Sequence, residues 1–173
     1  SLASSLRELE LWFVSNLSNE CLSSLAALTS LTSLEFIGQQ EITCKNFPSS
    51  LSRLQRIKLN QTDYESEGLT ALASLAGSLT SLSLSSTQRK QHVDHAPLAL
   101  FTRLEKFSIA NSAIELSDLS RLSPTIRHLT TNRCHNLSLI SFREFTNLHS
   151  LTTLKMNHIS INDEGTHIYL FIK

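Results

Sequence analysis

One pattern of apolar residues recurs seven times along this chain, and it constrains the fold more than any other feature. The pattern is L-x-x-L-x-L, where L stands for Leu, Ile, Phe or Met. Its first positions lie 25, 23, 25, 25, 22 and 25 residues apart, and Thr131 is the one polar residue among the 21 apolar positions. A period of about 20–50 residues indicates units that bury their apolar faces against one another, so the sequence predicts a solenoid. The matches begin at Leu6, Leu31, Leu54, Leu79, Leu104, Ile126 and Leu151.

Each match predicts one β-strand, because neighbouring side chains on a strand point to opposite faces. The apolar positions then face inward, and the residues between and beside them face outward. Ranges 18–28, 66–77 and 115–122 carry apolar residues at helical spacing and predict short return helices, the second capped by Ser66 and ended by Gly77. Pro48 and Pro97 predict one-turn or irregular returns. We therefore expect an α/β solenoid with parallel strands on the concave face and short helices or loops on the convex face.

The repeated pattern resembles the leucine-rich repeat. Cys134-His-Asn-Leu-Ser138 resembles the cysteine-containing subclass of this repeat, as do Phe36–Thr43 and, more loosely, Ile159–Gly165. That subclass is familiar from the F-box substrate adaptors of ubiquitin ligases. The run from Leu28 to Glu35, LTSLTSLE, is instead similar to repeats of plant intracellular immune receptors. Both resemblances imply a scaffold that binds a protein partner.

The resemblance also implies a small polar residue three positions after the last apolar one, where it bonds to backbone groups at the strand end. Val14 and Ile159 depart from this expectation near the two ends, and Gln39 is too large for it. In the middle repeats the expected residues are present. The seven residues at this turn position are Val14, Gln39, Thr62, Thr87, Ser112, Cys134 and Ile159.

Charge and composition narrow the class of partner. The net charge is zero at a pI of about 7.0, and no apolar run is long enough to cross a bilayer. We therefore expect a protein partner and neither nucleic acid nor a membrane. Three cysteines at unrelated spacings favour reduced thiols and a cytoplasmic location. Residues 1–173 are expected to form a single array of about seven repeats, as a fragment of a longer chain.

The outward residues are the candidate binding surface. Trp12 and Phe13, with Ile37 one strand over, have the composition of an interface hot spot, although they could also pack against preceding repeats. A second group of basic residues could meet an acidic or phosphorylated partner, or could keep the exposed sheet solvated. The members of this group are Arg56, Lys58, Lys106, His128, Arg133 and Lys155.

Catalytic and metal sites find little support in the sequence. The chain has no G-x-S-x-G, H-E-x-x-H or G-x-x-x-x-G-K-[ST] motif, and its four glycines leave little for a phosphate-binding loop. His92, Asp94 and His95 invite a metal interpretation, but zinc needs three or four convergent ligands. We expect residues 88–95 to form a polar surface loop. No cofactor, metal or catalytic residue is predicted, and an enzyme with an unrecognised site is the remaining alternative.

A pair of neighbouring substitutions tests the inward and outward assignment. Leu82→Ala should lower the free energy of unfolding by about 2–5 kcal/mol, the range for truncating a buried leucine. Ser83→Ala, one residue further and outward, should change it by no more than about 0.5 kcal/mol. Urea unfolding of the two variants measures both, and an unchanged midpoint for Leu82→Ala would contradict the assignment.

Overall fold

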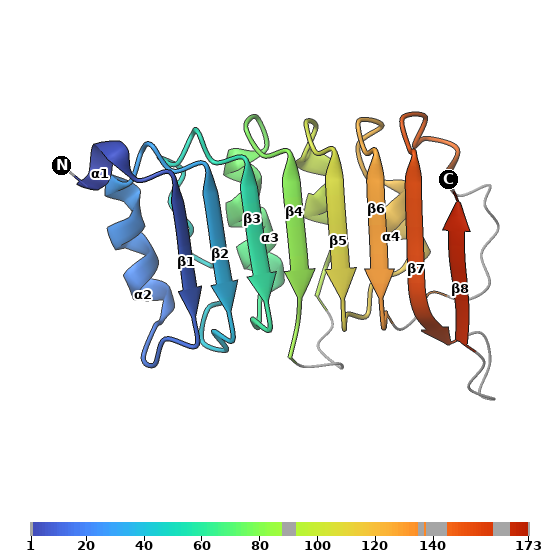
Figure 1. Ribbon diagram of the computed structural model, residues 1–173, viewed down its shortest axis with the longest axis horizontal. Coiled ribbons are helices and arrows are strands. Elements are labelled where there is room, and N and C mark those ends of the chain that lie inside the picture. Colours follow the sequence, from blue (N-terminus) through green and yellow to red (C-terminus); the bar gives the residue numbers. More distant parts are fainter. Residues whose placement is uncertain (1, 88–92, 135–136, 138–144, 161–166, 173) are drawn as a thin grey trace.

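A computed structural model describes residues 2–87, 93–134, 137, 145–160 and 167–172; for Leu2, 159–160 and 167–172 the description covers the backbone alone. Its strands form one sheet in which the spatial order equals the sequence order (Figure 1). Seven strands are parallel and the eighth is antiparallel to the seventh. The strands are β1 Glu8–Trp12, β2 Ser33–Ile37, β3 Arg56–Asn60, β4 Ser81–Ser85, β5 Lys106–Ala110, β6 His128–Asn132, β7 Thr153–Ser160 and β8 His167–Ile172.

The return segments cover one face of this sheet (Figure 1). Two of the predicted helices continue as 3₁₀ turns, η1 after α2 and η2 after α3, and Pro97 lies in the short 3₁₀ segment η3. The predicted α/β solenoid, with a strand and a short helix or loop per repeat, is confirmed. The return elements are α1 Leu2–Ser5, α2 Asn19–Leu22, η1 Ser23–Ala27, α3 Ser66–Leu72, η2 Ala73–Leu75, η3 Ala96–Leu100 and α4 Leu116–Ser120.

The predicted cap of α3 is wrong by one residue. Glu65, whose backbone is extended, occupies the cap position, and Ser66 is the first helical residue. The Ser66 hydroxyl instead accepts a hydrogen bond of 2.8 Å from the backbone N–H of Asp94 in the next return segment. A hydroxyl that looked like a local cap therefore joins two repeats.

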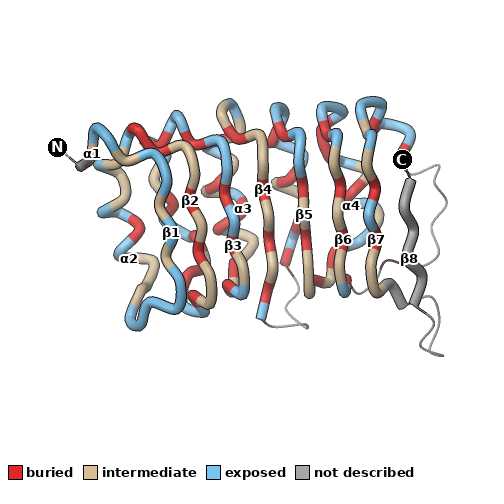
Figure 2. Tube along the Cα trace, in the orientation of Figure 1, coloured by how far each residue is buried: buried red, intermediate tan, exposed pale blue. Residues whose placement is uncertain are grey.

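Strand register repeats the motif position by position. Leu34 pairs with Ile57, Ile57 with Leu82, and Leu82 with Phe107, so equivalent inward residues form a continuous column. These four side chains are at most 1% exposed, and Figure 2 shows buried residues alternating with more exposed ones along β2 to β6. The core is a single layer between the sheet and the return segments, and burying each leucine contributes roughly 1.5–3 kcal/mol.

Three repeats enter their strand through the sequence Leu-Thr-x-Leu, and the threonine has the same structural role in each of them. The Thr32 hydroxyl donates to the carbonyl oxygen of Arg7 at 3.0 Å, and the backbone N–H groups of Thr32 and Ser33 donate to the same oxygen. Thr80 and Thr152 make the same hydroxyl contact to the preceding repeat, to Gln55 and Arg127. The threonine thus ties the start of a strand to the repeat before it.

The turn position is shifted from the prediction in the fourth repeat, and the structure shows what replaces the small polar residue in the first two repeats. In the fourth repeat Ser86 is buried and Thr87 is exposed, so the inward residue comes one position earlier than expected. Gln39 is 3% exposed and its amide donates to the carbonyl of Ile37 at 3.2 Å, which explains why a larger residue is accepted there. Val14 is 42% exposed and lies outside the core. The side chain of Ile159 lies outside the described residues.

Gly68 permits a close contact between repeats within α3. A Cβ at this position would overlap the carbonyl oxygen of Thr43, whereas a Cβ at Gly77 would meet no atom. The same carbonyl accepts a hydrogen bond from the N–H of Glu65, so it is fixed in place. Glycine is therefore required here by packing, although it weakens the helix.

This contact gives a test of repeat stacking. Gly68→Ala should lower the free energy of unfolding by about 1–3 kcal/mol, the usual cost of overpacking, despite the better helix propensity of alanine. Gly77→Ala is the matched control and should be neutral or stabilising by up to about 1 kcal/mol. Chemical denaturation measures both. Equal effects of the two substitutions would contradict the close contact between Gly68 and the Thr43 carbonyl.

Candidate protein-binding surface

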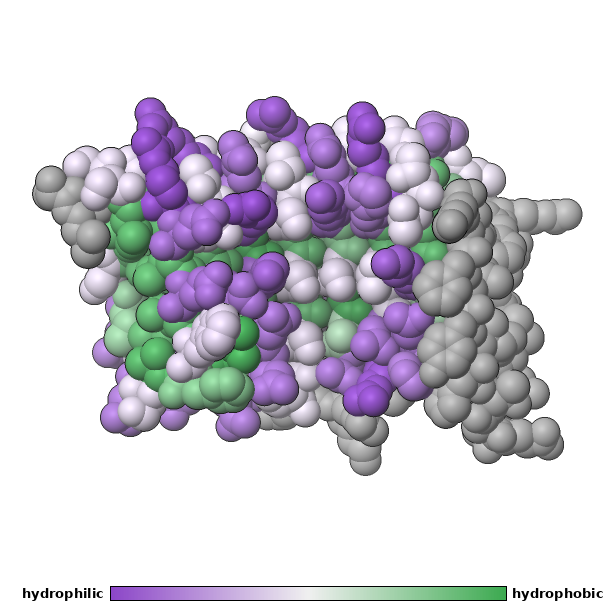
Figure 3. Space-filling model, viewed as in Figure 1, coloured by the Kyte–Doolittle hydropathy of each residue, from purple (hydrophilic) through white to green (hydrophobic). Residues whose placement is uncertain are grey.

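The outward face of the sheet presents three rows of side chains that cross the strands. The first row runs from Glu8 to Thr153, the second from Glu10 to Lys155 and the third from Trp12 to Asn157. Figure 3 views this face and shows polar colouring over most of it, with an apolar area around the ends of β1 and β2. The rows exist because register matches equivalent positions. Each outward residue therefore has its neighbours set by the adjoining repeats.

Trp12 and Phe13 lie where the sequence predicts them, on the surface at the end of β1. Their exposed fractions are 58% and 69%, and Ile37, the register partner of Trp12, is half-buried. Phe13 has a left-handed backbone with φ of 49°, and its ring packs over Gly38, where a Cβ would overlap it. We define Trp12, Phe13, Val14 and Ile37 as the apolar patch.

Two of the predicted basic residues are already paired. Arg56 contacts the Glu8 carboxylate at 2.6 Å, and Lys58 contacts Glu35 at 3.0 Å. Glu35 also accepts a hydrogen bond of 3.2 Å from Asn60. The side chains of both cations are half exposed, so each pair adds no more than about 1 kcal/mol to stability. The pairs nevertheless neutralise these charges on the outward face of β1 to β3.

The Arg56–Glu8 pair spans two repeats, so contacts on the outward face extend beyond the adjacent repeat. Ser33 stands between them in the first row and is too short to separate them. A buried contact also skips a repeat, because the Tyr64 hydroxyl donates to the Ser112 hydroxyl at 3.2 Å. Side-chain length therefore sets the range of contact along the solenoid.

The remaining basic residues lie toward the C-terminal end. Lys106 and Lys155 are exposed, His128 is half-buried on the same face, and none of the three has an ion-pair partner among the residues that the structure describes. Arg133 is exposed in the turn after β6, with a left-handed φ of 51°. It stands at the opposite end of that strand from His128 and does not join the other three.

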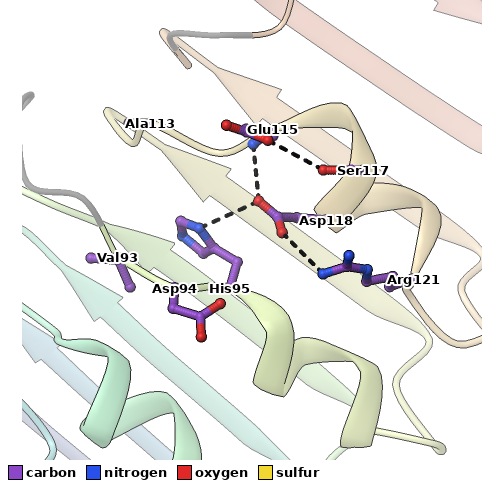
Figure 4. A pocket seen from close by; sticks show the side chains of 8 residues that line it. All are labelled: Val93, Asp94, His95, Ala113, Glu115, Ser117, Asp118 and Arg121. Atoms are coloured by element: carbon purple, nitrogen blue, oxygen red, sulfur yellow. Dashed lines mark hydrogen bonds and ion pairs between the residues drawn. The ribbon is translucent and has the colours of Figure 1, made fainter.

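The predicted polar surface loop is wrong for its last residues. Val93 and His95 are 7% and 2% exposed. The side chain of His95 turns into the space between two return segments. Its Nε2 lies 3.3 Å from the Ser112 hydroxyl. Figure 4 shows the contact on the other side of the ring, where its Nδ1 lies 3.8 Å from Asp118. His92 lies outside the described residues.

Serine, histidine and aspartate thus meet in one place, but without the access that a nucleophile needs. Ser112 is 4% exposed and accepts a hydrogen bond from the buried Tyr64, whose pKa is raised by burial. The adjacent surface pocket, about 210 Å³, is lined by His95, Asp118 and Arg121 and not by Ser112 (Figure 4). A substrate in this pocket would not reach the hydroxyl. The arrangement holds η3 and α4 together.

Metal ligands do not converge in the described part of the chain, where no group of three or more His, Cys, Asp or Glu side chains has suitable geometry. No helix in that part is long and apolar enough to span a bilayer.

Among the comparisons with known proteins, those with solved structures find similar folds. Internalin InlF of Listeria monocytogenes superposes with a TM-score of 0.62 at 25% identity, and the match covers 94% of this chain and 45% of that one. Internalin C2 of the same organism gives 0.50 at 18% identity, over 89% and 82% of the two chains, which bears on the fold alone. Internalins are leucine-rich repeat proteins. This chain has the leucine-rich-repeat fold. No protein-family model matches the sequence, and no curated protein matches it significantly.

Three features of this leucine-rich repeat surface escaped the sequence analysis. Val14 belongs to the apolar patch, Gly38 supports the ring of Phe13, and carboxylates neutralise Arg56 and Lys58. The outward positions of Glu8 and Glu35 in the sequence could have predicted that carboxylates neutralise Arg56 and Lys58. In the parallel register Glu8 lies two strands from Arg56, and Glu35 lies one strand from Lys58.

The cysteines are unpaired, with Cys44 and Cys134 buried and Cys21 exposed. Burial raises the pKa of Cys44 to about 12 and that of Cys134 to about 11. The Cys134 thiol donates to the carbonyl of Ile109 at 3.5 Å, in the turn position of its repeat. Both buried thiols stay protonated at neutral pH and have little nucleophilic character.

Thiol titration tests this arrangement. At pH 8 a disulfide reagent should modify one thiol per folded chain, that of Cys21, and three in denaturant. Cys21→Ser should abolish the reaction of the folded protein and leave two thiols in denaturant. Rapid modification of a second thiol in the folded protein would contradict the burial of Cys44 or Cys134.

Proposed function

We propose that this chain is a binding scaffold that holds another protein against the outward face of its sheet. The apolar patch is the observation that carries the proposal. Among the described residues four large apolar side chains are exposed, and Trp12, Phe13 and Val14 are three of them. Exposed aromatic residues gathered on a polar surface are the usual anchors of a protein interface.

Packing of these residues against a preceding repeat is the competing explanation, and the sheet geometry argues against it for Trp12. A preceding strand would lie beside β1 in the plane of the sheet, whereas the Trp12 side chain points out of that plane. Outward residues with a strand on both sides, such as Ile37 and Ser83, remain partly exposed. Another strand would therefore leave part of the Trp12 ring exposed.

The proposal treats residues 1–173 as one repeat array without a cofactor or a reaction of its own. It places the protein in the cytoplasm, because two buried, unpaired thiols suit a reducing compartment. A protein partner is preferred to nucleic acid, because the chain has no net charge to attract a polyanion.

A finer proposal is that the array reads substrates for a ubiquitin ligase. The burial of Cys134 at the turn position supports it, since the cysteine-containing subclass places a thiol there. The threonine contacts at Thr32, Thr80 and Thr152 favour the alternative, an immune or signalling sensor, because they arise from the Leu-Thr-x-Leu signature. Co-purification of ligase core subunits with the intact protein would favour the adaptor.

Substitution of the aromatic anchors tests the proposed function. Trp12→Ala with Phe13→Ala should weaken binding of a partner captured from cell extract by at least ~2 kcal/mol, the scale of an interface hot spot. Quantitative capture over a range of protein concentrations measures the effect, and the thermal midpoint of the same variant should stay close to that of the parent.

Leu100→Ala is the matched control, because Leu100 is 55% exposed but lies on the return side. It should leave capture unchanged. Intact capture by the Trp12 and Phe13 double variant, together with a lower thermal midpoint, would favour packing over binding.

A further inference from the structure

Three basic residues lie on neighbouring strands of the outward face, one each on β5, β6 and β7. Lys106 and His128 are register partners on adjacent strands, about 4.8 Å apart at the backbone. Lys155 stands one strand and two residues further, about 8 Å from His128. Thr130 occupies the centre, since it follows His128 on the same face and is the register partner of Lys155. We call Lys106, His128, Thr130 and Lys155 the basic cluster.

The cluster differs from the other cations of this face because its charge is not neutralised by described residues. Arg56 and Lys58 form ion pairs with Glu8 and Glu35, whereas the outward positions of β5 to β7 contain no carboxylate. Glu105 and Arg127, which precede β5 and β6, are adjacent, and their opposite formal charges cancel. A local excess of positive charge therefore remains over these three strands, although the whole chain is neutral.

The donors in this cluster match a phosphate group better than a carboxylate. Two ammonium groups, an imidazole with an N–H in either protonation state, and the Thr130 hydroxyl offer donors from separate directions. A phosphoserine or phosphothreonine brings a charge of about −1.5 to −2 and three acceptor oxygens. A carboxylate brings one charge and two oxygens, so it would leave part of the cluster without a partner.

Resting on the proposed function, we propose that the basic cluster binds a phosphorylated serine or threonine in the protein partner. The apolar patch, several strands away on the same face, would then hold a different part of that partner. The chain as a whole has no net charge and so no extended electrostatic attraction for a polyanion, which favours a phosphopeptide over a nucleic acid.

Two labelled degenerate peptide libraries test the proposal, one with phosphoserine and one with serine at a fixed central position. Fluorescence anisotropy with the full chain should show at least ~10-fold tighter binding of the phosphoserine library. The preference should weaken as salt is raised, because exposed charges are screened beyond about 10 Å at 0.1 M. Lys106→Gln with Lys155→Gln should remove the preference.

Arg56→Gln with Lys58→Gln is the matched control, since it removes the same charge from the same face. The released Glu8 and Glu35 lie at least three strands from β5, about 14 Å, so the phosphoserine preference should stay within ~2-fold of the parent. Equal losses in both double variants would reduce the effect to general electrostatics and overturn the proposal. Equal binding of the two libraries would do the same.

Two competitors identify the source of the phosphate. An oligonucleotide of equal length that binds as tightly as the phosphoserine library, or inorganic phosphate that displaces it at equal concentration, would overturn the assignment to a protein segment. The Trp12→Ala, Phe13→Ala variant should keep the phosphoserine preference. This variant separates the two proposals, because loss of capture without loss of the preference tests the apolar patch alone.

Discussion

Burial of each repeat against the next is the interaction on which the rest of this structure depends. A single strand and its return segment cannot enclose a core, so Leu34, Ile57, Leu82 and Phe107 become buried only as members of a column. The same stacking brings strand-start carbonyls to the threonines of the following repeat. It also allows the Thr43 carbonyl to approach Gly68. Packing and backbone hydrogen bonding therefore support one register.

That register also builds the outward face. Because the inward columns fix which residues are neighbours, side chains separated by about 25 residues in sequence become adjacent on the surface. The face then divides into an N-terminal part on β1 to β3 that carries the apolar patch and the two ion pairs, a set of serines on β4, and a basic C-terminal end. A partner that lay across the strands would meet all three regions. A solenoid can in this way present different chemistry along one continuous surface.

Buried polar groups appear where the return segments meet. Tyr64, Ser112, His95 and Asp118 form a connected set between the sheet and the convex side. Burying such groups costs free energy unless they are hydrogen-bonded, so the set favours one alignment of η3 and α4 over others. Its resemblance to a catalytic arrangement follows from residue types alone, because the serine is enclosed.

The sequence by itself determined the repeat, the strand positions and the outward residues. Inward leucines at fixed offsets allow only one alternation of faces, so the placement of Trp12, Lys58 and Lys155 followed from period and parity. Three-dimensional structure decided which of these residues are available. Pairing of Arg56 with Glu8 depends on the short Ser33 between them, and burial of His95 depends on where two return segments meet. Periodicity carries information about the side of a strand on which a residue lies, whereas the distance between side chains from different repeats is set only by packing.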